Sequence, residues 1–248
     1  MVRCYAEPKA WVEGRVTLSP AESHHLLHVM RAGVGDTVMI FDGAGVEAVA
    51  RLARSAGKIA ELEVAELRRQ PRPAPAITIL QALIREQKMD MVVEKGAELG
   101  ASRIVPVAAE RSIVRLAAKA ADSRVERWNK IALSAAKQCG GNWLMRIDPV
   151  VPLAVAVRAA PPADLLLVAS LEKDAVPLKT VMGKAASGTL ATVSVLIGPE
   201  GDLTPAELSA AKAAGAVPVS LGHAVLRAET AAICALSILK YELSNLPA

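Results

Sequence analysis

Several residue types that would support common modes of stabilisation are scarce in this chain. Its 248 residues include three cysteines, Cys4, Cys139 and Cys234. They are odd in number and far apart, so they match neither a disulfide framework nor the paired spacing of a zinc site. A chain of this length buries enough surface to fold without covalent links. The cysteines indicate a reducing compartment, and we expect a cytoplasmic protein.

Long apolar runs and aromatic residues are also scarce. Between Met1 and Gly14, charged residues such as Glu7 and Lys9 stand where a signal peptide would need its apolar core. No later run approaches the roughly 20 apolar residues that span a bilayer, so we expect no membrane partner. With six aromatic residues in the chain, base stacking cannot dominate an affinity for RNA.

Positive charge is concentrated in the middle of the chain. Residues 85–146 contain twelve Lys and Arg against seven Asp and Glu, whereas residues 147–248 contain seven against nine. This distribution suits a protein that contacts a polyanion with one region. Two solvated helix faces would produce the same counts, so the charge pattern alone leaves both interpretations open.

A proline-rich segment divides the chain. Three prolines lie between Pro71 and Pro75, where they prevent regular structure and favour an extended connector. We therefore expect one domain over residues 1–70 and another over residues 76–248.

Before the connector, short apolar or alternating runs are separated by glycine-containing turns, which predicts a small β-barrel. These runs cover residues 36–40, 46–52 and 59–67. Residues 20–31 are the one segment in this half with helical periodicity, and Ser19 can cap that helix.

After the connector, apolar strands alternate with longer helical segments, which is typical of an α/β domain with a mainly parallel sheet. The strands are predicted at residues 77–83, 103–108, 165–171, 193–197 and 217–221. The helices are predicted at residues 87–99, 122–138, 204–214 and 229–243. Thr204, Pro205 and Glu207 give the third helix a clear start with a capping box. The last helix is apolar almost all round, so we expect burial on most sides and a place in a homodimer interface.

Two glycine-containing loops follow the last two predicted strands. They cover residues 197–202 and 221–230, and each leads toward a predicted helix. In open α/β sheets, ligands bind beyond the carboxyl ends of the strands, where glycine lets a ligand approach the backbone. Neither loop has the G-x-G-x-x-G pattern or the Lys-Ser/Thr pair of a P-loop, so phosphate binding is not indicated. Ordinary strand-to-helix turns are an equally good interpretation of these loops alone.

The two loops resemble those of a known family. Ile197-Gly198-Pro199-Glu200-Gly201 and Leu226-Arg227-Ala228-Glu229-Thr230-Ala231 resemble the knotted C-terminal half of the SPOUT methyltransferases. They resemble more closely the bacterial enzymes that methylate N3 of a uridine in small-subunit (16S) ribosomal RNA. Glu98-Leu99-Gly100 and Glu110-Arg111-Ser112 are similar to the start of that catalytic domain, and Phe41-Asp42-Gly43 to its PUA-like barrel. The similarity covers nearly the whole chain.

This resemblance implies a trefoil-knotted parallel sheet behind an N-terminal PUA-like β-barrel that binds RNA. It also implies a homodimer and S-adenosylmethionine as cofactor. The residues expected to bind the cofactor are Leu171, Ile197, Gly198, Gly201, Leu221, Gly222, Leu226 and Ala231. The chain departs from the family pattern at Asp202, Leu203, Ala224 and residues 140–143. Because the cofactor loops are intact, these departures concern the exact nucleotide more than the methyl transfer.

The chemistry of uridine methylation indicates which residues act. N3 of uridine carries a proton at neutral pH, so attack on a sulfonium methyl requires that this proton leave and that the anion be stabilised. Arg227 is the expected catalytic residue, because arginine stays charged and donates a fork of hydrogen bonds. Glu229 is the second, either as base or as the group that orients Arg227. An internal salt bridge that shapes the loop is the alternative for this pair.

Contacts with RNA phosphates are expected from five basic residues, Arg31, Arg85, Lys88, Arg111 and Arg115. His24, His25 and His28 form a histidine cluster, but no further ligand is evident nearby, so we expect no metal site.

Two other functions compete with this prediction. A non-catalytic RNA-binding protein could keep the fold, although it would have no reason to keep glycine-lined loops with Arg227 and Glu229 in place. A SPOUT methyltransferase of another RNA nucleotide is the second alternative. A small-molecule α/β enzyme is disfavoured by the basic middle part and the barrel in front of it.

Overall fold

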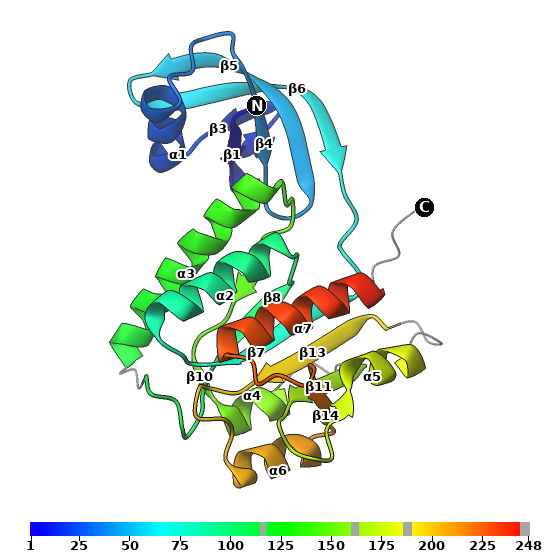
Figure 1. Cartoon of the computed structure of the whole chain (residues 1–248). Coiled ribbons are helices and arrows are strands. Elements are labelled where there is room, and N and C mark those ends of the chain that lie inside the picture. The colour runs from blue at the N-terminus through cyan, green and yellow to red at the C-terminus, as the bar shows by residue number, and fades with distance from the viewer. Residues whose placement is uncertain (115–117, 160–163, 186–189, 244–248) are drawn as a thin grey trace. The chain divides into compact units, whose positions relative to one another are not determined.

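The computed structural model describes residues 1–114, 118–159, 164–185 and 190–243 (Figure 1). The chain forms two compact units, which are treated separately below. The first contains Met1–Arg72 together with Leu133–Leu144, and the second contains Pro73–Ala132 and Met145–Ala248. The long helix α3 (Ala118–Cys139) therefore begins in the second unit and ends in the first. The predicted single boundary at residues 70–76 does not account for residues 133–144, which belong to the first unit.

The first unit is a six-stranded sheet that curls into a half-barrel (Figure 1). Its strands are β1 (Arg3–Tyr5), β2 (Trp11–Val12), β3 (Arg15–Thr17), β4 (Thr37–Phe41), β5 (Val46–Ala56) and β6 (Ile59–Arg69). They lie in the order β1-β4-β5-β6-β3-β2, with β1 and β4 parallel and the other pairs antiparallel. Ala48, Ala50 and Leu52 of β5 are buried in alternation, as a strand with one face on a core requires. Burial raises the pKa of the neighbouring core thiol, Cys4, to about 11, so this cysteine stays protonated.

The helix of the first unit starts as predicted and ends earlier. α1 (Pro20–His24) is capped by Ser19, whose Oγ accepts a hydrogen bond from the backbone N of Glu22 at 3.2 Å. It continues into a π-helical turn, His25–Val29, that buries Leu26. Arg31 then takes a φ of 58°, which ends the helical path before the predicted limit at residue 31.

Residues that follow α3 complete the first unit. The backbone N of Gly45 donates to the carbonyl of Asn142 at 3.0 Å, and the backbone N of Leu144 donates to Gly43 at 2.9 Å. A Cβ added at Gly45 would lie 2.5 Å from the ring of Trp143. Only glycine leaves room here for the Trp143 ring and for the carbonyl oxygen of Gln70, which would lie 2.8 Å from the added Cβ.

The second unit is built on a sheet in which every described strand pair is parallel. Its strands are β7 (Ala76–Ala82), β8 (Arg103–Ala108), β9 (Arg146–Ile147), β10 (Val151–Pro152), β11 (Leu165–Ala169), β12 (Val176–Pro177), β13 (Thr192–Ile197) and β14 (Val217–Ser220). They lie in the order β10-β8-β7-β13-β11-β14-β12, with β9 beside β8. The predicted α/β class is confirmed, while the trefoil knot stays a prediction.

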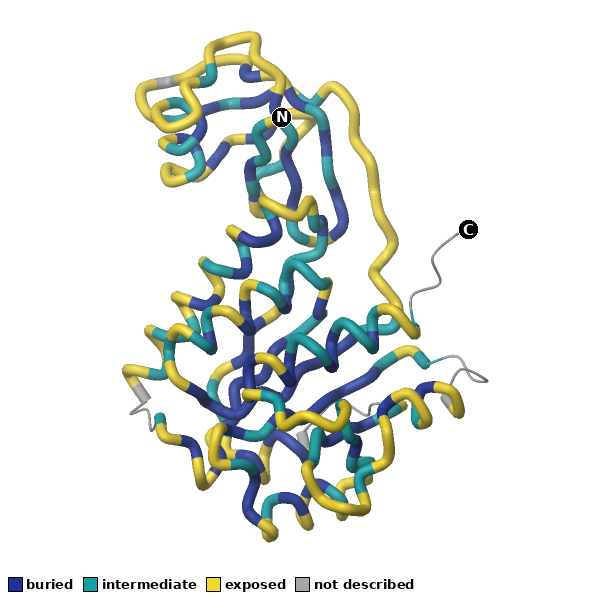
Figure 2. Tube along the Cα trace, viewed as in Figure 1, coloured by how far each residue is buried: buried dark blue, intermediate teal, exposed yellow. Residues whose placement is uncertain are grey.

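Helices cover both faces of this sheet. α2 (Glu86–Glu98), α5 (Leu178–Ala185) and α7 (Ala228–Leu243) pack on one face with part of α3, and α4 (Leu153–Ala159) and α6 (Pro205–Ala213) pack on the other. Along β7, Ile77 and Ile79 face the first group, whereas Leu80 and Ala82 face the second. The central strands are therefore buried on both faces (Figure 2). This explains why they read as continuous apolar runs in the sequence.

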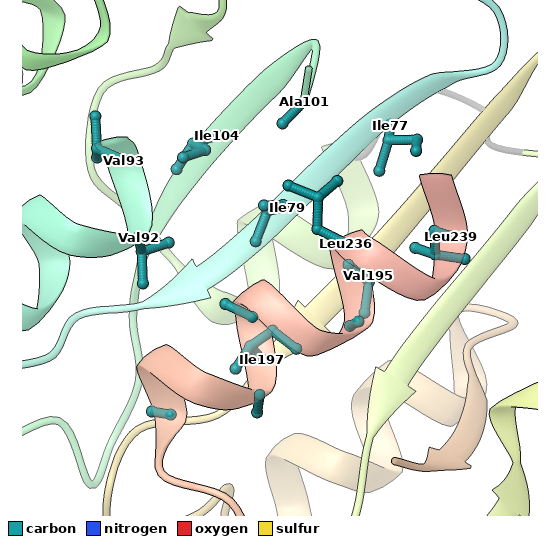
Figure 3. Packing of buried hydrophobic residues seen from close by; sticks show 14 of the residues in the cluster. Ile77, Ile79, Val92, Val93, Ala101, Ile104, Val195, Ile197, Leu236 and Leu239 are labelled. Carbon is teal, nitrogen blue, oxygen red and sulfur yellow. The ribbon is translucent and has the colours of Figure 1, made fainter. Parts of the chain in front are cut away.

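The last helix, α7, lies over the centre of the sheet. Leu236 and Leu239 lie among the side chains of Ile77, Ile79 and Val195 (Figure 3). Its buried residues recur at helical spacing on this inner side, and the residues between them are half-exposed. Within one chain, α7 is therefore buried on one side, and the predicted burial of its other side in a homodimer interface stays a prediction.

We expect Gly45→Ala to destabilise the first unit. The new methyl group would overlap the Trp143 ring, and overpacking of this kind costs about 1–3 kcal/mol. Gly57→Ala is the matched control, because Gly57 also has a positive φ (65° against 96°) but no atom lies within 4 Å of the added carbon. Urea denaturation followed by tryptophan fluorescence should show a larger loss of unfolding free energy for the Gly45 variant. Equal losses would mean that the approach of Trp143 does not constrain this unit.

Candidate active site

A pocket lies at one edge of the parallel sheet of the second unit. β11 is paired with both β13 and β14, and because the three strands run parallel their carboxyl ends meet at this edge. The pocket has a volume of about 280 Å³. It is lined by residues 169–171, by residues 197–202 except Gly201, and by much of the segment 219–231. Each of these segments contains or follows one of the three strand ends.

The pocket contains most of the residues expected to bind a cofactor. Seven of the eight line it, namely Leu171, Ile197, Gly198, Leu221, Gly222, Leu226 and Ala231. The eighth, Gly201, lies instead against Arg111: its carbonyl accepts a hydrogen bond from Arg111 Nη1 at 3.2 Å, and an added Cβ would be 3.3 Å from the Arg111 Cβ. Gly201 therefore shapes the loop. Ala169, Ser170 and Val219 also line the pocket but were not predicted, since nothing in their local sequence distinguishes them.

The pocket lining combines apolar side chains with a few polar groups. Its polar and charged side chains belong to Ser170, Glu200, Asp202, Ser220 and Arg227. Sites of this composition hold a ligand by apolar contact and orient it with a few polar groups. The arrangement suits a ligand with an adenine and a ribose better than a nucleoside phosphate.

Gly222 has a backbone conformation that a side chain would disturb. Its φ is 135°, and no atom lies within 4 Å of an added Cβ, so a side chain would extend into open space beside the pocket lining. The Ser220 hydroxyl accepts a hydrogen bond from the backbone N of Gly222 at 3.3 Å and fixes this turn. The loop after β14 thus presents bare backbone at Gly222.

Asp202 reproduces a conformation that glycine adopts easily. Its φ is 60°, in the left-handed region, and glycine is usual here in the family that the sequence resembles. Its backbone N donates to Pro199 at 3.0 Å, and its Oδ1 accepts from the backbone N of Leu203 at 2.8 Å. Aspartate tolerates the left-handed region better than most residues. The departure at Asp202 therefore preserves the turn.

The start of α6 anchors the other end of this loop. The predicted capping box is confirmed: Thr204 accepts from the backbone N of Glu207, and Glu207 accepts from the backbone N of Thr204 at 2.9 Å. Glu207 Oε1 also accepts from the backbone N of Glu110 at 2.8 Å. Residues that follow β8 therefore hold the loop that follows β13.

Arg227 lines the pocket and immediately precedes α7. Its carbonyl accepts a hydrogen bond from the backbone N of Ala231 at 2.8 Å, so Arg227 occupies the N-cap position of that helix. Its side chain is exposed.

Glu229 is buried and paired with a lysine. The residue is 8% exposed, and its Oε2 lies 3.3 Å from Lys88 Nζ. The same Nζ lies 3.8 Å from Glu200 Oε1. Among the ion pairs of the described residues, Glu229 has Lys88 as its partner and not Arg227. The structure thus brings together three charged residues that are far apart in the sequence, and local sequence carried no signal for the Lys88 pairing.

The residues expected to contact RNA phosphates lie in different environments. Arg31 is exposed in the first unit, and Arg85 is exposed at the N-cap of α2. Lys88 is engaged with the two carboxylates, and Arg111 with the carbonyl of Gly201. Arg115 lies outside the described residues.

The structure offers no metal cluster within its described ranges. His24 and His28 have ring centroids 5.0 Å apart, yet no three His, Cys, Asp or Glu side chains gather there or elsewhere in those ranges in a way that could hold a metal ion. Likewise, none of the described helices has the length and apolar character needed to cross a membrane.

The sequence is similar to known families and proteins. A model described as an RNA methyltransferase domain matches residues 70–240, and one described as an RNA methyltransferase PUA domain matches residues 18–65. Ribosomal RNA small subunit methyltransferase E of Bacillus subtilis is 30% identical over 231 residues, which cover 91% of this chain and 90% of the relative. The Synechocystis protein of the same name is 31% identical over 236 residues, 95% of this chain and 76% of the relative.

Solved structures show the same similarity in three dimensions. Ribosomal RNA small subunit methyltransferase E from Neisseria gonorrhoeae, bound to S-adenosylmethionine, has a TM-score of 0.86 and 30% identity over 97% of both chains. A methyltransferase from Legionella pneumophila in complex with the same cofactor has a TM-score of 0.87 and 29% identity over 97% of both chains. The fold of this chain is therefore similar, over nearly its full length, to folds that hold S-adenosylmethionine.

Asp202→Gly and Asp202→Val should differ in their effect on the stability of the pocket loop. Glycine removes the strain of the left-handed conformation while it loses the Leu203 hydrogen bond, so we expect little change in stability. Valine loses the same hydrogen bond and keeps the strain, which for a β-branched residue should cost about 1–2 kcal/mol. Thermal and urea unfolding of the two variants would test this difference. Equal stability would show that the loop does not require a positive φ at this position.

Proposed function

Since this chain belongs to the RNA methyltransferase family, we propose that it methylates N3 of a uridine in 16S ribosomal RNA of the small ribosomal subunit, with S-adenosylmethionine as methyl donor. One observation carries the proposal: the pocket at the carboxyl edge of the sheet joins seven expected cofactor residues to Arg227. The relatives named for this activity match the chain over most of its length.

The pocket fits S-adenosylmethionine in its composition. Leu171, Ile197, Leu221 and Leu226 offer apolar contact for an adenine, and Gly198 and Gly222 leave backbone accessible. With Ala231 these residues would hold the cofactor, and Gly201 would keep its loop in shape. When bound there, the cofactor supplies an activated methyl group on a sulfonium sulfur.

Arg227 is the residue we assign to the reacting uridine. As the N3 proton passes to Glu229 or to a water molecule, negative charge develops over N3, O2 and O4 of the uridine base. A guanidinium can donate two hydrogen bonds to such an anion and neutralise it. Glu229, two residues further on, would be the base or an orienting group. Its described ion pair is with Lys88 and not with Arg227, so an orienting role would act on the loop through Lys88.

The position of Arg227 supports a functional role over a structural one. Helix N-caps favour Ser, Thr, Asp and Asn, and a cation there is opposed by the helix dipole by about 0.3–1 kcal/mol. Arg227 therefore contributes little to the start of α7, and its pocket exposure is the better reason for an arginine.

RNA would be bound by both parts of the chain. We assign an RNA-binding role to the PUA-like domain over residues 1–70, where Arg31 is exposed, and the methyl transfer to the domain over residues 76–248. Arg85, Lys88, Arg111 and Arg115 are the proposed phosphate contacts of the second domain. Work on ribosomal RNA agrees with the cytoplasmic location expected from the cysteines.

The direct test is methylation of small-subunit RNA. Small subunits from cells that lack the protein would be incubated with the purified chain and labelled S-adenosylmethionine, and their nucleosides analysed by mass spectrometry. We expect N3-methyluridine to form. RNA binding without methyl incorporation would favour a non-catalytic RNA-binding protein, and a different methylated nucleoside would correct the target.

We also propose that the chain forms a homodimer. The outer side of α7 carries an apolar stripe of Ile233, Cys234, Ile238 and Tyr241, of which Tyr241 is 79% exposed. Light scattering should find a dimer at micromolar concentration and a monomer for the double variant Ile233→Lys/Tyr241→Lys, with the melting temperature as the control for folding. A monomeric unaltered protein would contradict this proposal.

Replacement of Arg227 should affect turnover far more than cofactor binding. If the guanidinium acts on the anion, its contribution is made mainly in the transition state. Arg227→Ala should then lose about 10²–10³ in rate, and Arg227→Lys should recover part of it. Arg227→Ser should also be slow, yet at least as stable as the parent, because serine is a better N-cap. A near-parental rate, or loss of cofactor binding in Arg227→Ala, would refute the catalytic role.

Gly222→Val provides the contrast, because it should lose cofactor binding first and activity as a consequence. Gly215→Val is the matched control: Gly215 also has a positive φ and open space around its Cβ, but it does not line the pocket. Calorimetry should show weaker binding of S-adenosylmethionine to Gly222→Val than to Gly215→Val. Both variants carry backbone strain, and only the Gly222 variant places a side chain at the pocket.

A further inference from the structure

Lys88 contacts Glu200, which lines the pocket, and Glu229, which lies in the first turn of α7 beside it. It lies in the first turn of α2 and is not one of the residues that line the pocket. Its Nζ lies 3.3 Å from Glu229 Oε2 and 3.8 Å from Glu200 Oε1. Glu200 belongs to the loop after β13, and Glu229 follows the loop after β14. One ammonium group therefore connects the loop after β13 with the first turn of α7, which directly follows the loop after β14.

Glu229 depends on this lysine because water has little access to it. Its side chain is 10% exposed, and Oε2 has no hydrogen-bond partner in the structure, so the approach of Lys88 is an ion pair without hydrogen-bond alignment. A carboxylate buried in this way is costly unless an opposite charge compensates it. The N-terminus of α7 adds a smaller favourable contribution.

The environment of Lys88 is better suited to an internal contact than to RNA. Its side chain is 26% exposed and already faces two carboxylates. A phosphate that approached it would also meet those negative charges. Arg85, three residues earlier, is exposed and has no acidic partner among the described ion pairs.

We propose that Lys88 is a positioning residue that holds the two cofactor loops in register by neutralising Glu229 and Glu200. Of the basic residues at the start of α2, this leaves Arg85 as the phosphate contact. The inference rests on the proposed function of the pocket and replaces the phosphate contact that was assigned to Lys88 there.

The test compares three variants with the unaltered full chain. Lys88→Met removes the charge and keeps the length of the side chain. Lys88→Met/Glu229→Gln removes both charges. Arg85→Met removes a neighbouring charge that the proposal assigns to RNA. Each is measured for affinity toward S-adenosylmethionine by calorimetry without RNA, for melting temperature, and for the salt dependence of binding to small-subunit RNA.

The proposal predicts a specific pattern. Lys88→Met should weaken cofactor binding by about tenfold or more, because Glu229 is left as an uncompensated buried charge. The double variant should return to within about threefold of the parent, because the buried charge of Glu229 is removed and Glu200, whose side chain is 21% exposed, keeps access to water. Arg85→Met should bind the cofactor like the parent and lower the slope of log K against log salt by about one.

Other patterns would overturn it. If Lys88→Met binds the cofactor like the parent and lowers the salt slope for RNA, Lys88 is a phosphate contact. If the double variant is no better than Lys88→Met, the ion pair does not determine loop geometry. If Lys88→Met unfolds at the assay temperature, the double variant is the deciding measurement. A double variant that folds and binds the cofactor supports the proposal, and a double variant that is also unfolded refutes it.

Failure of the proposed function would be recognised separately. An unaltered protein that does not bind S-adenosylmethionine would refute the function of the pocket. The melting temperatures would still test Lys88, since the single variant should melt below both the parent and the double variant. Equal melting temperatures would then refute the ion-pair role.

Discussion

The parallel pairing of β11 with β13 and β14 determines where the loops that line the pocket leave the sheet. Register pairs such as Val168 with Leu196, and Ala169 with Val219, bring the three strands to a common edge. The pocket forms there because three turns leave the sheet side by side. β7 ends at the same edge of the sheet, so the helices that follow β7 and β14 both begin near it. Lys88 and Arg227 are far apart in the sequence, and both lie near the site because each stands at the start of one of these helices.

The helices differ in the residue that occupies the N-cap position. α1 and α6 are capped by Ser19 and Thr204, as helix energetics favours. α2 and α7 begin instead with Arg85 and Arg227, and no side-chain cap is formed by Arg85. Departures from the residue preferences of a helix start are expected where a residue has a role outside its own helix. Two of the helices that begin at the carboxyl edge of the sheet thus have an arginine at the N-cap, whereas α6, which also begins there, has the Thr204 capping box.

Much of the fold could be predicted from the sequence, because its signals are local. Strands buried on both faces, such as β8, were predicted with their observed limits, and the capping box of α6 gave that helix its start. The two-residue strands β9, β10 and β12 and the short helices α4 and α5 were missed, since each is too short for a periodic pattern.

In the site, glycine and loop position indicated residues that the structure places in the pocket lining, whereas contacts with partners from far along the chain carried no local signal. The family resemblance indicated seven residues that line the pocket. It did not indicate that Gly201 would pack on Arg111, or that Glu229 would pair with Lys88. Both contacts depend on which elements pack together, and hydrophobic periodicity identifies a buried face without identifying what covers it.

The return of the chain to the first unit through residues 133–144 has a consequence for synthesis. Residues 43–45 hydrogen-bond with residues 142–144, so the backbone groups of that turn stay unpaired while only residues 1–72 have been made. Unpaired strand groups are sites of wrong association. The N-terminal unit therefore cannot be completed on the ribosome before α3 emerges, by which time more than fifty residues of the second unit have already been translated. Residues 73–132 must therefore remain without their later sheet partners β11, β13 and β14 while the first unit waits for its last segment.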